Sequence, residues 1–218
     1  MKENIIVESR RLAEFIQKKE EFSVIESFGC PYNNHVGALF TDIILQSGLN
    51  YKYVVQPRVN FILENYPEAY TVERFFNTVD NNGVENVLQW KDPIKINRLF
   101  NLFDFCFCSD LNFSVDIKIF LANRQNQLKF LEVNGIGNKT LDYLLKLLNV
   151  DTIAVDRHIY SFVKMAGIDC NDYDYVKNVV EYAADIMNIS RRSIDHSIWQ
   201  YMSTLKKPNK QLKLELFL

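Results

Sequence analysis

Apolar residues recur at helical spacing along most of the chain. Each stretch places them at roughly i, i+3 and i+4, the spacing of one face of an α-helix, and runs for about three turns. Short polar breaks separate the stretches, which cover residues 8–19, 36–47, 51–65, 72–78, 84–90, 93–106 and 114–130. Residues 22–28 alternate instead, which predicts a short strand or an extended segment. The pattern predicts an all-α protein built as a packed helical bundle.

Two further helices are predicted on either side of a tight turn. The first ends near Glu132, and the second begins at Asn138 or Lys139. Between them, Gly135 and Gly137 allow a positive φ and keep side chains out of the way. Because the turn opens a helix, free amide N–H groups point the same way, a geometry that binds a phosphate oxygen. The alternative is an ordinary helix–helix turn in which the glycines are only steric.

A last informative segment follows at residues 152–165. Residues 152–155 are predicted to be extended and residues 157–165 to be helical. Asp156 stands between them, in the N-cap position, where a carboxylate accepts hydrogen bonds from the first-turn amides. A cap alone explains an aspartate at this place.

Two motifs resemble a known superfamily. They are LEVNGIGNKT at residues 131–140 and VDRHI at residues 155–159. Both are similar to the helix-hairpin-helix DNA glycosylases, the group that contains endonuclease III and the 8-oxoguanine DNA glycosylases. The run TIAVDRHI at residues 152–159 is especially like endonuclease III. Asn134 departs from the proline that many members carry before the hairpin.

The resemblance implies catalytic roles for Lys139 and Asp156. Lys139 falls where the strand-cleaving members carry a lysine, whose neutral amine attacks the sugar and remains attached as an imine. Partial burial would lower the pKa of such a lysine. Asp156 falls on the superfamily's aspartate, which stabilises positive charge developing on the sugar. Without the resemblance, Lys139 is a solvated residue in a first helical turn, where the helix dipole disfavours a cation.

The resemblance also implies contacts with the DNA backbone. These fall to Gln46 and to the hairpin residues Gly135, Ile136, Gly137 and Asn138. Gln46, in IILQSGLN, resembles the glutamine that enters the DNA stack in endonuclease III. The alternative is a polar residue at a helix end. A monovalent cation at the hairpin carbonyls is a further implication of the resemblance.

A base pocket is implied by the segment SIDHSIWQYMS at residues 193–203. Asp195 and Trp199 are four residues apart on one helical face, and they resemble the base-pocket helix of archaeal-type 8-oxoguanine glycosylases. In that arrangement Asp195 accepts hydrogen bonds from the purine, and Tyr143 stacks on the other side of the flipped-out base. The alternative is that Trp199 is a core residue and Asp195 a surface acid.

The net charge and the cysteine content restrict the predicted partner and cofactor. The net charge is −2 and the isoelectric point about 6.0, which argues mildly against nucleic acid, because phosphate contacts need Lys and Arg. Basic residues do gather between residues 187 and 213. Of the four cysteines only Cys170 follows the motifs, so the four-cysteine iron–sulfur loop of endonuclease III cannot form. We expect no metal site and no cofactor apart from the hairpin cation.

The sequence therefore predicts a bifunctional DNA glycosylase and lyase. We expect two helical lobes with a DNA-binding cleft between them: residues 30–138 form a central lobe ending in the hairpin, and residues 1–29 with 139–218 form the second. The expected lesion is 8-oxoguanine in double-stranded DNA. The alternatives are oxidised pyrimidines such as thymine glycol, and a non-catalytic hairpin module that binds DNA.

The cellular location is predicted from two features that the sequence lacks. The first residues lack the apolar run of a signal peptide, and no stretch approaches a membrane span. We expect a monomer in the cytoplasm that associates with the nucleoid when it acts.

Overall fold

Helices make up the regular structure of the described chain. A computed structural model describes residues 2–27, 32 and 34–205, and within these ranges it contains helices and no strand. The predicted all-α class is therefore confirmed. Residues 22–27 form neither a helix nor a strand, and the Ile25 amide donates a hydrogen bond to Ser197 Oγ at 2.8 Å.

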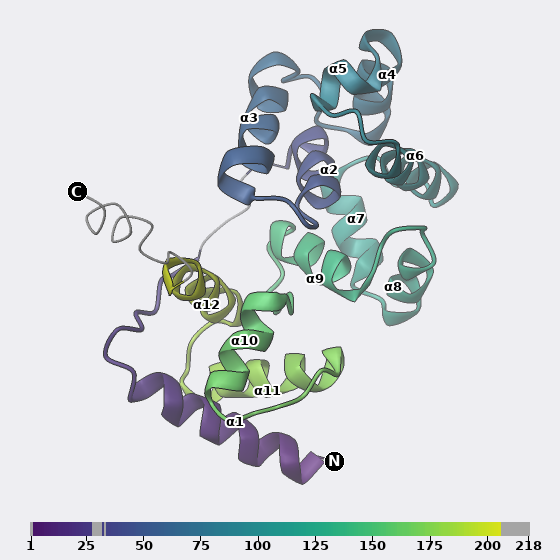
Figure 1. Cartoon of the computed structure of the whole chain (residues 1–218). Helices are drawn as coiled ribbons and strands as arrows, with labels where there is room; N and C mark the ends of the chain where they lie inside the picture. The colour runs from purple at the N-terminus through teal and green to yellow at the C-terminus, as the bar shows by residue number, and fades with distance from the viewer. Residues whose placement is uncertain (1, 28–31, 33, 206–218) are drawn as a thin grey trace, which may run out of the picture. The chain divides into compact units, whose positions relative to one another are not determined.

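The chain divides into two compact units (Figure 1). Unit 1 takes Met1–Phe28 and Asp151–Leu218, and unit 2 takes Gly29–Val150. The second boundary differs from the predicted one at 138/139, and Lys139 belongs to unit 2. The physical reason is that the helix carrying Lys139 buries its leucine stripe, including Leu141 and Leu144, in the core of unit 2.

Unit 2 is built around one buried helix, α2 (Val36–Leu45). All ten of its residues are buried, and it packs against α3, α4, α6 and α9. A helix that is apolar on nearly every side belongs in a core, so the polar Thr41 and Asp42 are exceptional there. The surrounding elements are the π-helix η1 (Tyr51–Val55), α3 (Gln56–Asn65), α4 (Val72–Asn82), α5 (Val84–Leu88), α6 (Pro93–Cys108), α7 (Ser114–Leu121), α8 (Arg124–Leu131) and α9 (Asn138–Leu147).

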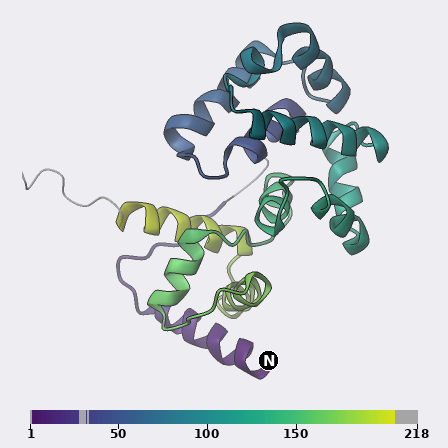
Figure 2. The same ribbon diagram turned by 45° about the vertical axis from the view of Figure 1, so that its right-hand side comes forward.

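Unit 1 joins segments from far apart in the sequence. Its helices are α1 (Lys2–Gln17), α10 (Arg157–Met165), α11 (Tyr173–Ile186) and α12 (Arg191–Leu205). Helix α1 lies beside α11, and α10 packs against α12 (Figure 2). Leu12 of α1, Phe162 of α10 and Ile198 of α12 meet in one core. None of the helices in the described part of the chain combines the length and apolar character that crossing a membrane requires.

Candidate active site

Lys139 stands in the first turn of α9 and is half-buried. Its ammonium donates a hydrogen bond to Gln46 Oε1 at 2.8 Å. One turn along, the Tyr143 hydroxyl donates to the Asp42 carboxylate at 3.1 and 3.2 Å. Gln46 and Asp42 are also one helical turn apart. Two polar contacts therefore join α9 to the α2 segment, and the two helices run antiparallel.

Asp42 is the centre of a buried polar cluster. Its side chain is fully buried, and it accepts hydrogen bonds from the hydroxyls of Tyr32 and Tyr143. The Tyr51 hydroxyl lies 3.1 Å from that of Tyr32 and extends the cluster to η1. Burial raises the pKa of Asp42 to about 6, although the tyrosine hydroxyls and the charge of Lys139 act in the opposite direction. Burial and the charge of Asp42 raise the pKa of Tyr51 to about 12.

This cluster supplies proton-handling groups beside Lys139. A carboxyl group with a pKa of about 6 can hold or release a proton near neutral pH, and this one accepts hydrogen bonds from the Tyr32 and Tyr143 hydroxyls. None of this was expected from the sequence. The available signal was an aspartate inside the apolar run ALFTDIIL, since an acid is almost never fully buried unless its oxygens have partners.

Both the backbone and the side chain of Gln46 form hydrogen bonds within unit 2. It caps the end of α2, where its backbone amide donates to Asp42 O at 2.8 Å, and its side-chain oxygen is held by Lys139. Its Nε2 atom is buried and has no hydrogen-bond partner among the described residues. Entering a DNA stack would therefore require Gln46 to leave Lys139.

The turn before α9 gives its two glycines different roles. Gly135 has φ +88°, which only glycine adopts at little cost, whereas Gly137 is extended at φ −121°. Between them Ile136 is buried, while Asn138 is exposed. Gly137 is the N-cap of α9, and no side chain caps the helix there. A Cβ on Gly137 would meet nothing within 4 Å, so the start of α9 is open.

Arg98 of α6 lies against this turn. A Cβ on Gly135 would come within 2.3 Å of Arg98 Nε and 2.5 Å of Arg98 Cγ. The guanidinium thus already places a positive charge at the turn, which disfavours a monovalent cation on the neighbouring carbonyls. In the described ranges no group of three or more His, Cys, Asp or Glu side chains is placed to hold a metal ion.

Asp156 occupies the N-cap of α10 in unit 1. Its Oδ1 accepts hydrogen bonds from the amides of His158 at 2.8 Å and Ile159 at 3.1 Å. The predicted cap and the predicted bounds of this helix are confirmed. The preceding segment is held as well: the Val155 amide donates to the Tyr173 hydroxyl at 3.3 Å. Lys139 and Asp156 belong to different units.

Asp195 and Trp199 lie on α12 with opposite exposures. Asp195 is 6% exposed, and its Oδ2 accepts a hydrogen bond from the Ala154 amide at 2.8 Å. Trp199 is 37% exposed and stacks on His196, with ring centroids 6.0 Å apart. The acid is therefore buried and the indole partly open, the reverse of a core tryptophan beside a surface acid. Tyr143, the third expected pocket residue, is in unit 2 with its hydroxyl on Asp42.

The basic stretch expected near the C-terminal end is described only in part. Arg191 pairs with Asp185 at 2.9 Å and with Glu181 at 3.3 Å, so its charge is already partnered within unit 1. The lysines at 206, 207, 210 and 213 lie outside the described residues, as does Cys30.

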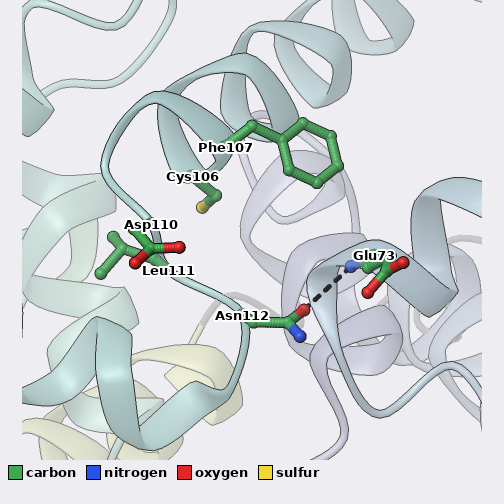
Figure 3. Close-up of a pocket in the computed structure, with 6 residues that line it drawn as sticks. All are labelled: Glu73, Cys106, Phe107, Asp110, Leu111 and Asn112. Carbon is green, nitrogen blue, oxygen red and sulfur yellow. Dashed lines mark hydrogen bonds between the residues drawn. The ribbon is translucent and has the colours of Figure 1, made fainter.

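A hollow of about 360 Å³ lies elsewhere in unit 2 (Figure 3). Two of its groups are the carboxylates of Glu73 and Asp110, which would repel a polyanion such as DNA. Burial raises the pKa of the Cys106 thiol there to about 12, which leaves it unreactive. The lining residues are Glu73, Cys106, Phe107, Asp110, Leu111 and Asn112. The hollow offers no activated nucleophile.

Residues 117–203 match a family described as a domain of unknown function (DUF8548). The matched range includes both Lys139 and Asp156 and takes in parts of both units. No curated protein and no solved structure matches the chain.

Proposed function

We propose that this protein is a DNA glycosylase that also cleaves the strand at the resulting abasic site. The carrying observation is the placement of Lys139: half-buried, bound to Gln46, and next to a buried carboxyl group with a pKa of about 6. The motifs LEVNGIGNKT and VDRHI, which resemble those of helix-hairpin-helix glycosylases, supply the reaction class. A solvent-exposed lysine without a catalytic role would not require a contact with Gln46 or a buried carboxyl group nearby.

The proposed reaction begins with attack of neutral Lys139 Nζ on C1′ of the damaged nucleotide. The bond between C1′ and the base breaks, and the base leaves with the electron pair and takes up a proton. Opening of the C1′–O4′ bond, with proton transfer from nitrogen to O4′, yields an imine. Loss of a C2′ proton then breaks the C3′–O3′ bond and releases the 3′ phosphate. Asp156 stabilises the positive charge that develops on the sugar.

The proposed lesion is 8-oxoguanine, on the resemblance of Asp195 and Trp199 to a base-pocket helix. The partly exposed indole of Trp199 is available for stacking. Oxidised pyrimidines are the second candidate. The hydrogen bond from the Ala154 amide to Asp195 favours them, because it occupies an oxygen that a purine would use. The run TIAVDRHI favours them too.

Borohydride trapping tests the proposal. Duplexes carrying 8-oxoguanine, thymine glycol or an abasic site, and an undamaged duplex, are incubated with the protein and reduced. We expect a covalent complex with the abasic duplex and with one damaged duplex. Lys139→Gln should abolish trapping while duplex binding survives. Lys146→Gln, seven residues later on the same helix, is the matched control and should trap normally.

Three outcomes would count against this function. Absence of an adduct with every duplex would leave only a hairpin module that binds DNA. Unchanged trapping by Lys139→Gln would move the nucleophile elsewhere. Loss of duplex binding together with trapping in Lys139→Gln would make the lysine a structural residue.

A further inference from the structure

A second lysine, Lys95 of α6, approaches the same end of α2 as Lys139. Its Nζ atom donates hydrogen bonds to the backbone oxygens of Ser47 at 2.9 Å and Ile44 at 3.0 Å. Lys139 donates to the side-chain oxygen of Gln46, the residue immediately before Ser47, at 2.8 Å. The two lysine side chains thus converge on one short segment of unit 2, residues 44–47.

The partners of Lys95 are those of a charged side chain. A third backbone oxygen, that of Leu45, lies 3.5 Å from its Nζ atom. Carbonyls only accept hydrogen bonds, and an ammonium offers three N–H donors, whereas a neutral amine has two and a lone pair. The same carbonyls form the negative end of α2, which favours a cation. Burial and the charges of Arg98 and Lys139 lower the pKa of Lys95, and the charge of Asp92 raises it.

Lys139 can keep its contact in either protonation state. A neutral amine donates an N–H to an amide oxygen such as Gln46 Oε1, as an ammonium does. When two amines lie close together, a charge on one disfavours a charge on the other. Because carbonyls hold Lys95 in its charged form, Lys139 is the lysine that loses its proton more easily. A neighbouring cation is one of the means by which proteins activate a nucleophilic lysine.

Asp42 acts on Lys139 in the opposite direction. This acid of α2 is buried, and its charge and that of Lys139 attract each other. Hydrogen bonds from Tyr32 and Tyr143 stabilise its carboxylate form. An ionised Asp42 therefore favours a charged Lys139, and the positive charge of Lys95 offsets that effect.

We propose that Lys95 is a positioning residue for the reaction of Lys139, whose neutral, nucleophilic form is favoured by the fixed positive charge beside it. This inference rests on the proposed function in giving Lys139 a substrate. It adds a residue of α6 that lies outside both sequence motifs. Lys95 touches neither the substrate nor the reacting atoms, and it acts through Lys139.

Trace acetylation of the protein without DNA tests the effect of this charge. Acetic anhydride reacts with neutral amines, so the rate at which it labels a lysine follows the neutral fraction of that side chain. Labelling of Lys139 is measured by mass spectrometry between about pH 6 and pH 11, relative to the exposed Lys129 in the same molecules. Lys95→Gln removes the charge and keeps N–H donors for the carbonyls. The midpoint of the Lys139 profile should rise by about 1 pH unit, and labelling at pH 7 should slow about 10-fold.

Two further variants separate the charge of Lys95 from its contacts with the end of α2. Lys95→Arg keeps a cation there, and Lys91→Gln, the matched control, removes the charge of an exposed lysine four residues earlier. Both should leave the Lys139 midpoint within about 0.3 pH units of wild type. An unchanged midpoint in Lys95→Gln would overturn the inference and leave Lys95 as a cap of α2, and so would equal rises in Lys95→Gln and Lys95→Arg.

The wild-type profile provides a test that does not depend on the folding of any variant. The midpoint of Lys139 should lie below that of the exposed Lys129, because a cation beside Lys139 makes its proton easier to remove. A midpoint of Lys139 at or above that of Lys129 would contradict the proposal.

Cleavage of a duplex with a pre-formed abasic site extends the test to the reaction. In single turnover, Lys95→Gln should cleave about 10-fold more slowly than wild type at pH 7, and the deficit should shrink toward pH 9. Lys95→Arg should cleave at the wild-type rate. A deficit of the same size at every pH would contradict a role through the neutral amine. If wild type neither cleaves nor traps any duplex, the glycosylase is defeated, whereas the acetylation profiles still decide whether Lys95 acts on Lys139.

Discussion

The surroundings of Lys139 and of Asp156 use their polar groups in different ways. Around Asp156, the carboxylate caps α10, and Asp195 and Tyr173 each accept a hydrogen bond from the backbone segment just before it. Around Lys139, the α9 start has no side-chain cap, and a carboxyl group is buried at Asp42 among tyrosines.

The two sets of polar groups differ in whether the stability of the fold is enough to explain them. The groups near Asp156 satisfy backbone amides that any fold must satisfy, so stability is a sufficient reason for them. A buried acid and an uncapped helix start cost stability. Residues that are costly for folding and gather around one half-buried lysine support the proposed site at Lys139.

The largest test of this contrast is Asp42→Asn. The folded pKa of about 6 lies above the ordinary value of 3.8, so the folded state favours the protonated acid. Stability that is present below pH 3.8 is lost as the pH rises through 6. The difference between the two values (6 minus 3.8, about 2.2) corresponds to about 3 kcal/mol. The free energy of unfolding of Asp42→Asn, measured in urea, should therefore gain about 2 kcal/mol on wild type between pH 4 and pH 8, because part of the ~3 kcal/mol is already lost by pH 4. Parallel pH curves would show that Asp42 does not carry this cost.

Asp156 should show an intermediate effect, and its two substitutions separate capping from catalysis. Asp156→Ala loses two hydrogen bonds to the α10 amides and should lower the free energy of unfolding by about 1–2 kcal/mol. Asp156→Asn keeps a capping oxygen and should fall within about 0.5 kcal/mol of wild type. Excision by Asp156→Asn should nonetheless drop by about 100-fold or more. Full excision by this variant would make the cap its whole role.

The smallest expected change in stability is at Gly137. Gly137→Asp gives α9 the kind of cap that α10 has, and should raise the free energy of unfolding by a few tenths of a kcal/mol. The new carboxylate stands where a phosphate would bind, so the affinity for duplex DNA should fall. Gly137→Asn adds a cap of similar size without the charge, and it should retain more of that affinity. Equal affinities of both variants and wild type would contradict an anion site at this turn.

Local signals explain what the sequence could predict. The bounds of α10 and its Asp156 cap follow from a polar residue directly before an amphipathic run, and both are confirmed. The start of α9 at Asn138 follows from the glycine turn in the same way. Each signal lies within a few residues of the element that it sets.

Long-range contacts explain what the sequence could not predict. Asp42 was hidden because its partners Tyr32 and Tyr143 come from segments 10 and 101 residues away. The burial of Asp195 depends on an amide 41 residues earlier, at Ala154. The boundary after Val150 depends on the hydrophobic core in which the leucines of α9 are buried. Helical periodicity predicts that one face of α9 is buried, but it does not predict in which of the two cores.

The pairing of α1 with α11 has a consequence for the order in which the protein is made. Helix α1 ends at Gln17 and its partner begins at Tyr173, 156 positions later (173 minus 17). At about 5–20 residues per second, the ribosome needs roughly 10 to 30 s to supply that partner. During this interval all of unit 2 is synthesised, while Leu12 and Ile16 of α1 still lack the core that finally buries them. The first helix of the chain is thus among the last to reach its native contacts, and a nascent chain stalled after residue 150 carries an exposed apolar stripe for chaperones to cover.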